Sequence, residues 1–189
     1  MLVMGILNVT PDSFSDGGQF DSSVAAITRG LEMVAEGADI IDVGGESTRP
    51  GAQRTSQEQE LERTIPVVKA LAEQGVVVSI DTMRAEVARA AVAAGAEYIN
   101  DVSGGIADAE MHRTAAQLGV NYIVMHWRGH SLDMNTKATY SDVVAEVKAE
   151  LSQQIEKALA AGITPEKLLI DPGLGFAKGA DHKIGRAHV

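Results

Sequence analysis

The 189-residue sequence has no cysteine, few aromatic residues and few basic ones. Without cysteine it can form no disulfide framework, no cysteine-ligated zinc site and no cysteine nucleophile. The 16 Lys and Arg residues stand against 26 Asp and Glu residues, and the resulting net charge of −10 argues against binding to a nucleic-acid backbone. No apolar run reaches the ~20 residues that cross a bilayer, and no signal peptide is recognisable. We therefore expect a cytoplasmic protein without nucleic-acid or membrane partners.

The sequence does contain six short apolar runs that alternate with five longer helical patterns. The runs are Leu2–Leu7, Asp39–Val43, Val76–Asp81, Glu97–Asp101, Asn121–His126 and Leu168–Asp171. Most of them end in a polar residue, as parallel strands covered on both sides do. Each helical pattern stops at a glycine, which is the residue that ends a helix most easily. These glycines are Gly37, Gly75, Gly95, Gly119 and Gly162. The alternation predicts βα units joined into a parallel sheet.

Two features favour a (β/α)8 TIM barrel over an open doubly wound sheet. Polar residues follow every strand, not one switch point, and the first loop lacks a glycine-rich dinucleotide fingerprint. A complete barrel needs about 250 residues, so this sequence is short by about two βα units. We predict an incomplete α/β barrel with about six βα units and the last two strands missing, over residues 1–182. Residues 183–189 are predicted to be a non-native or disordered tail.

The helical patterns also predict which residues begin and pack the helices. In the first helix, Val24, Leu31 and Val34 fall on the apolar face together with Ile27. Ser56 and Gln59 fit a capping box at the start of the second helix. Pro66 lies inside that second pattern and is expected to kink the helix or split its first turn.

Polar side chains stand at the end of every predicted strand. They are Asn8, Asp42, Asp81, Asn100 with Asp101, His126 and Asp171. In a parallel barrel such residues point toward one mouth, where they would form a ring rich in hydrogen-bond acceptors. A ring of this kind suits a ligand that presents several N–H donors, because buried carboxylates must be paired. The alternative is that Asp and Asn stand there because they start loops well.

The loop after the first strand, residues 8–18, is long and rich in oxygen-bearing side chains. Its Asn and Asp oxygens could hold a hard cation such as Mg2+, which often bridges to substrate phosphates. Phe14 is an apolar residue within this loop. It either contacts a ligand or anchors the loop.

The loop after the second strand, residues 44–52, combines glycines with polar side chains. Ser47 and Thr48 offer hydroxyl groups, and Arg49 offers a bidentate donor for phosphate or carboxylate. The equally weighted alternative is a solvated turn in which Arg49 pairs with Glu46.

Several of these segments together resemble dihydropteroate synthase, a family of pterin-binding TIM barrels. The first two motifs are long and specific, and the set runs in the family's order over about residues 2–182. The segments are Met4–Gly18 (MGILNVTPDSFSDGG), Asp42–Ala52 (DVGGESTRPGA), Ser79–Thr82 (SIDT), Asn100–Gly104 (NDVSG), Met125–His126 and Asp171–Lys178 (DPGLGFAK).

The resemblance implies an enzyme of folate biosynthesis. Such an enzyme condenses 6-hydroxymethyl-7,8-dihydropterin diphosphate with 4-aminobenzoate to give 7,8-dihydropteroate and diphosphate, assisted by Mg2+, and sulfonamides compete for the aminobenzoate site. The implied mechanism is dissociative and needs no side-chain nucleophile. The full-length protein is expected to be a homodimer.

The resemblance also assigns site residues. The pterin pocket is expected to include Asp81, Asn100 and Asp171, with Val102 and Met125 as its apolar wall. Asp171 is the residue expected to accept the paired N–H donors of the pterin edge.

Outside the pocket, the resemblance implies a metal site and two substrate loops. Asn8 is expected at the Mg2+ and diphosphate position. Thr48, with Ser47 and Arg49, is expected to contact substrate, and so is Phe14.

The sequence departs from the family after His182. The family's seventh-strand Ser-Arg-Lys and eighth-strand Arg-x-His segments have no strand to carry them here. They supply a pterin-contacting lysine and most of the anion-binding charge, so this chain is expected to be poorly stable and nearly inactive by itself. Two alternatives to a dihydropteroate synthase stay open: a pterin-binding methyltransferase barrel and a non-catalytic fragment.

Overall fold

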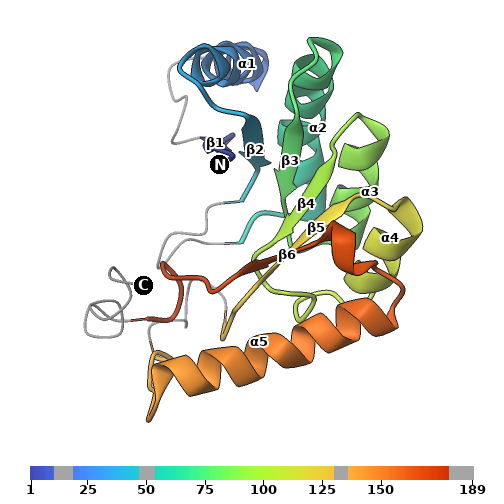
Figure 1. The fold of residues 1–189 in the computed structure, drawn as a ribbon. Coiled ribbons are helices and arrows are strands. Elements are labelled where there is room, and N and C mark those ends of the chain that lie inside the picture. Colours follow the sequence, from blue (N-terminus) through green and yellow to red (C-terminus); the bar gives the residue numbers. More distant parts are fainter. Residues whose placement is uncertain (11–18, 47–53, 130–135, 179–189) are drawn as a thin grey trace.

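The computed structural model describes residues 1–10, 19–46, 54–129 and 136–178 (Figure 1). All six predicted strands and all five predicted helices are present in these ranges. The strands are β1 (Met4–Asn8), β2 (Ile40–Gly44), β3 (Val78–Asp81), β4 (Tyr98–Asp101), β5 (Asn121–Met125) and β6 (Leu168–Asp171). The helices are α1 (Gln19–Ala35), α2 (Gln57–Glu73), α3 (Ala85–Ala93), α4 (Met111–Leu118) and α5 (Val143–Ala160), with a short 3-10 turn η1 (Pro165–Lys167) before β6.

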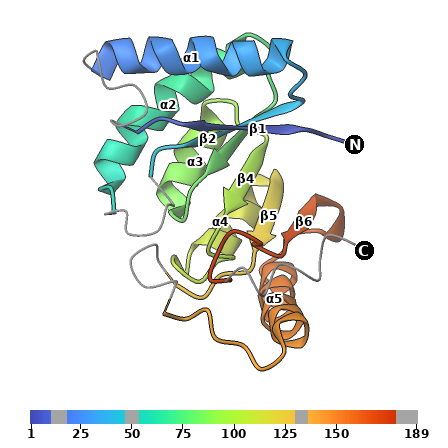
Figure 2. The same ribbon diagram turned by 90° about the vertical axis from the view of Figure 1, so that its left-hand side faces the viewer.

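The six strands form one parallel sheet whose spatial order, β1 to β6, is the order of the chain. A doubly wound sheet would reverse its order at a switch point, so this order confirms the incomplete (β/α)8 barrel. Figures 1 and 2 show helices α1 to α5 arranged around one face of the curved sheet. The opposite face is the inner face of the barrel wall. Among the described helices, none combines the length and apolar character needed to span a bilayer.

The hydrophobic core lies between the sheet and the helices. Residues on alternate positions of a strand point to opposite faces, so β2 to β5 contribute alternate side chains to this core. Leu7, Ile80, Ile99 and Tyr122 all face the helices and are at most 2% exposed. Their neighbours along each strand therefore face the inside of the barrel.

The packing face of helix α1 agrees with the predicted one only in part, because Ile27 and Leu31 pack against the core as predicted. Val24 and Val34 are 49% and 38% exposed, whereas Ala26 and Gly30 are buried. A Cβ on Gly30 would lie only 3.0 Å from a methyl carbon of Leu71 in α2. The small residues let α1 approach α2 and β1 closely, and this close approach decides the buried face.

The ends of the helices follow the sequence signals. The capping box is confirmed: Gln59 N donates to Ser56 Oγ at 3.2 Å, and Ser56 N donates to Gln59 Oε1 at 3.2 Å. The five predicted terminal glycines all have positive φ. The expected split at Pro66 is wrong, because α2 runs without interruption from Gln57 to Glu73.

Replacing Ser56 with alanine tests the capping box. The variant loses the acceptor for Gln59 N, so we expect its free energy of unfolding to fall by about 1 kcal/mol in urea titrations. Ser152→Ala, on the exposed side of α5, is the matched control and should change stability by less than about 0.5 kcal/mol. Equal effects of the two substitutions would contradict a stabilising role for the cap.

Candidate active site

A row of four residues crosses strands β1 to β4 at their carboxyl ends. Backbone pairing places Asn8 beside Gly44, Gly44 beside Asp81, and Asp81 beside Asn100. The side chains of Asn8, Asp81 and Asn100 point to the inner face of the sheet, because the core residues that precede them point to the helices. The predicted convergence of Asn8, Asp81 and Asn100 is therefore a consequence of strand register.

Gly44 leaves open space between the oxygens on either side of it. A Cβ at this position would lie 3.3 Å from Asp81 Oδ2 and 3.7 Å from Asn8 Oδ1. The two oxygens thus border the same small volume. A side chain there would crowd both of them, and glycine lets a ligand approach them instead.

The carboxylate of Asp42 lies one layer deeper in the barrel. Asp42 is 2% exposed, and its Oδ2 accepts a hydrogen bond of 2.8 Å from Asn100 Nδ2. This bond holds the amide group of Asn100 in a fixed orientation. Burial raises the pKa of Asp42, while the amide donor of Asn100 opposes that rise. The sequence identified Asp42 as a strand end without assigning it this supporting role.

Asp81 is the residue in the row with the least favourable electrostatic surroundings. Burial raises its pKa well above the usual range, and the nearby carboxylates of Asp42 and Glu60 raise that pKa further. A carboxyl group in this position gains most from a ligand that brings N–H donors or positive charge. The perturbed pKa at the mouth of a barrel is characteristic of a functional site.

Asp171 ends β6 on the same inner face. Met125 pairs with Asp171, and Ile123, two residues before Met125, pairs with Asn100. The carboxylate Oδ1 of Asp171 accepts a hydrogen bond of 2.7 Å from the backbone N of Gly173. Met125 is 2% exposed and Val102, just after β4, is 5% exposed. Their role as the apolar wall of a pterin pocket stays a prediction.

Two of the predicted mouth residues belong elsewhere. Asp101 faces the helices, where it accepts hydrogen bonds from Ser103, Gly105 and Tyr122. His126 follows the inner-facing Met125, and its imidazole contacts Glu150 of α5. The alternation of side chains along a strand separates Asp101 from Asn100 and His126 from Met125, so that only Asn100 and Met125 face the inside of the barrel.

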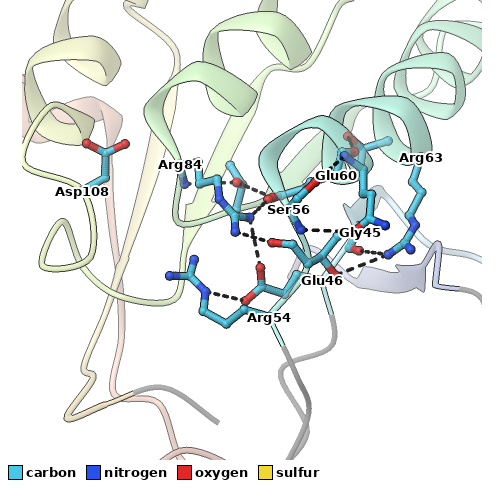
Figure 3. A network of polar contacts seen from close by, with 12 residues as sticks. Gly45, Glu46, Arg54, Ser56, Glu60, Arg63, Arg84 and Asp108 are labelled. Atoms are coloured by element: carbon cyan, nitrogen blue, oxygen red, sulfur yellow. Dashed lines mark hydrogen bonds and ion pairs between the residues drawn. The ribbon is translucent and has the colours of Figure 1, made fainter. Parts of the chain in front are cut away.

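The remaining predicted contact residues, Phe14, Ser47, Thr48 and Arg49, lie outside the described residues. Residues 46 and 54 on either side of the second loop are described, and a cluster of charged side chains surrounds them (Figure 3). Arg54 Nε donates to Glu46 Oε1 at 3.2 Å.

The centre of this cluster is the ion pair of Arg84 with Glu60. Glu60 lies on α2 and is 1% exposed, and it also accepts a hydrogen bond of 2.5 Å from Thr82 Oγ1. Burial raises the pKa of Glu60, and Thr82 and Arg84 partly offset that rise. Arg84 also reaches Glu46 Oε2 at 3.0 Å and the carbonyl oxygen of Thr55 at 2.5 Å (Figure 3). One guanidinium group therefore holds backbone and side chains on both sides of the loop.

A parallel barrel wall with acceptor oxygens at its carboxyl edge is the arrangement of a ligand-binding (β/α)-barrel enzyme. Residues 4–187 match the model of the family described as pterin binding enzyme, and the chain belongs to that family.

The relatives of the chain are dihydropteroate synthases. That of Mycobacterium leprae is 57% identical over 181 residues, which cover 95% of this chain and 64% of the relative. The Xanthomonas albilineans enzyme solved with 4-aminobenzoic acid has a TM-score of 0.91 at 48% identity, and the match covers 99% of this chain and 67% of that one. Its complex with 7,8-dihydropteroate gives 0.86 at 43% identity, with 99% and 66% covered. These findings confirm the resemblance, and the chain spans about two thirds of the length of these relatives.

Replacing Asp81 with asparagine tests the electrostatics of the mouth. Because the pKa of Asp81 is raised above the unfolded value of 3.8, the folded state binds more protons, and the carboxylate lowers stability as pH rises. Asp81→Asn should therefore raise the free energy of unfolding at pH 7.5 by about 1 kcal/mol or more, the scale of a one-unit change in pKa. At pH 4 the gain should vanish.

The measurement is urea unfolding at both pH values, with Glu97→Gln, an exposed carboxylate beside β4, as the control. A gain for Asp81→Asn that does not depend on pH would contradict the proposed electrostatic cost.

Proposed function

We propose that this chain carries the pterin site of a dihydropteroate synthase, in which 6-hydroxymethyl-7,8-dihydropterin diphosphate reacts with 4-aminobenzoate. The observation that carries the proposal is the row of inner-facing oxygens from Asn8, Asp81 and Asn100, with Asp171 on the same face. Consumption of 4-aminobenzoate with release of diphosphate by the full-length protein tests the reaction. Binding of a pterin by the 189-residue chain tests the site.

The donor pattern of a pterin matches these acceptors. One edge of the ring presents an amino group and a ring N–H side by side, and the carboxylate of Asp171 can accept both. Asp81 and Asn100 lie on the same inner face and can take further ring N–H and acceptor atoms. Met125 and Val102 offer apolar contact to the flat ring, whose faces carry no hydrogen-bonding groups.

The reaction separates charge, and the site provides the compensating groups. The bond between the pterin methylene carbon and the diphosphate oxygen breaks, and the leaving group takes the electron pair. The positive charge left on the pterin is stabilised by the carboxylates of Asp81 and Asp171. The neutral amine nitrogen of 4-aminobenzoate then bonds to the methylene carbon and loses a proton. No side chain forms a covalent intermediate.

The donor atoms of this site fit a magnesium ion. Asn8 Oδ1 is a hard oxygen ligand that borders the open space at Gly44, and Mg2+ prefers oxygen and keeps substrate phosphates among its ligands. When bound, Mg2+ would neutralise charge on the departing diphosphate. Asn8 would hold the ion at the carboxyl end of β1.

The two loops that follow β1 and β2 complete the proposal. Ser47, Thr48 and Arg49 would contact the diphosphate and the aminobenzoate, and Phe14 would also contact the substrate. The charged cluster around Arg84 supports this assignment. Arg63 Nη1 donates to the carbonyl oxygen of Gly45, and Arg84 binds Glu46 and the carbonyl oxygen of Thr55, so backbone on both sides of the second loop is held in place.

Removing the charge of Asp171 should weaken pterin binding. Asp171→Asn keeps the shape of the side chain but loses the ionised acceptor, and a hydrogen bond to a charged group is worth about 1.5–3 kcal/mol. We expect the Kd for 7,8-dihydropterin, measured by calorimetry, to rise about 10- to 100-fold. Glu166→Gln, an exposed carboxylate just before β6, should leave the Kd unchanged. Unchanged binding by Asp171→Asn would refute the assigned role.

Removing magnesium should affect only the ligand that carries diphosphate. With EDTA in place of Mg2+, we expect the pterin diphosphate to bind at least 10-fold more weakly, while 7,8-dihydropterin binds equally well. Asn8→Ala should abolish most of the effect of Mg2+ on the diphosphate ligand. The same Mg2+ dependence for both ligands would contradict a metal position at Asn8.

A further inference from the structure

Lys178, which follows β6 by seven residues, is a buried cation that forms hydrogen bonds to three uncharged groups. It is 6% exposed, and its Nζ lies 2.9 Å from His126 Nδ1, 2.9 Å from Gly173 O and 3.0 Å from Phe176 O. An ammonium group has three N–H donors, and each of these three acceptors can take one of them. Burying a lysine is unfavourable unless its donors are satisfied, so this arrangement is specific.

Gly173 connects Lys178 to the carboxylate of Asp171. Its backbone N donates to Asp171 Oδ1 at 2.7 Å, and its carbonyl oxygen accepts from both Lys178 Nζ and Phe176 N. Its φ is +63°, and a Cβ there would lie 2.6 Å from the carbonyl oxygen of His126. Gly173 thus adopts a backbone conformation that aims its N–H at Asp171 and its C=O at Lys178.

His126 links the same lysine to helix α5. Because Nδ1 accepts from the ammonium group, the ring proton belongs on Nε2, which lies 3.0 Å from Glu150 Oε2. Burial and then the charge of Lys178 lower the pKa of His126, so the neutral ring is favoured. Arg128 Nε in turn donates to Glu150 Oε2 at 3.0 Å. A continuous set of contacts therefore runs from α5 to the loop after β6.

The far end of this loop, residues 172–178, is held in an unfavourable conformation. Ala177 is a non-glycine residue with φ of +46°, which L-residues rarely adopt. Its carbonyl oxygen accepts a hydrogen bond of 2.9 Å from Tyr140 OH, and the ring of Tyr140 stacks under Arg128. Such a conformation persists only where the surrounding contacts enforce it.

We propose that Lys178 is a positioning residue for pterin recognition: its ammonium group fixes Gly173, and Gly173 fixes the Asp171 carboxylate that receives the ligand. The inference rests on the proposed function of Asp171. Lys178 acts through the loop, because its ammonium group binds the carbonyl oxygens of Gly173 and Phe176 within that loop. Its removal should lower affinity only as far as Asp171 contributes to that affinity.

A double-mutant cycle on the 189-residue chain tests this role. The variants are Lys178→Met, Asp171→Asn and the double substitution, and the Kd for 7,8-dihydropterin is measured by calorimetry. We expect Lys178→Met alone to raise the Kd about 10-fold. The double variant should bind no more weakly than Asp171→Asn alone, because both changes remove the same interaction. Lys167→Met, an exposed lysine just before β6, should bind like the unmodified chain.

The outcomes separate positioning from a merely structural role. Unchanged affinity in Lys178→Met overturns the proposal. A double variant whose loss equals the product of the two single losses also overturns it, because Lys178 would then contribute independently of Asp171. If Lys178→Met does not fold, Lys178→Arg replaces it, since the planar guanidinium keeps the charge but cannot reproduce the three bonds of a rotatable ammonium. The same non-additive pattern is then expected, with a smaller rise in the Kd for Lys178→Arg alone.

Amide hydrogen exchange at Gly173 gives a readout that does not depend on ligand binding. We expect exchange of the Gly173 N–H to accelerate at least 10-fold in Lys178→Met, with little change in the amides of β2 and β3. Unchanged exchange overturns the proposed link through Gly173. If the unmodified chain binds no pterin, the proposed function fails, and the exchange rate at Gly173 alone decides the link.

Discussion

The register of parallel pairing between β1 and β4 is the constraint on which the candidate site depends. Asn8, Asp81 and Asn100 share a row only because each strand is aligned with its neighbour at that residue. A slip of one residue would turn a strand's polar group toward the helices. The slip is prevented by apolar neighbours such as Ile80 and Ile99, which are fully buried under the helices. Hydrophobic burial on the outer face therefore positions polar chemistry on the inner face.

Buried carboxylates at the mouth of the barrel differ in their electrostatic compensation from those that face the helices. Glu60 is paired with Arg84, and Asp101 accepts from four donor groups, so these two carboxylates are compensated within the chain. Asp81 instead has its pKa raised by burial and by neighbouring carboxylates. The fold thus accepts an electrostatic cost at Asp81, where a ligand with N–H donors would offset it, and compensates the buried carboxylates of Glu60 and Asp101 within the chain.

Much of the fold was predictable from local patterns, and two of the errors concern the face of an element on which a side chain lies. Strand positions, terminal glycines and the Ser56 cap follow from hydrophobic periodicity and backbone preference, which act over a few residues. The packing face of α1 does not, because Gly30 and Ala26 gain their importance only from the nearness of Leu71. The strand ends also predicted Asp101 and His126 at the mouth of the barrel. This prediction was wrong, because the alternation of side chains along each strand turns both residues toward the helices.

The sequence by itself determined the parallel βα order and the residue types that end each strand, because these depend on short-range periodicity and on motifs that can be read directly. Tertiary structure alone decided which of those polar residues share a face, since that depends on the register between strands far apart in the chain. It also decided that Lys178, one of several charges in the last residues, is buried against His126 and the loop after β6. A charge in a glycine-containing loop carries no local signal of burial, and only contacts made across 52 residues of chain reveal it.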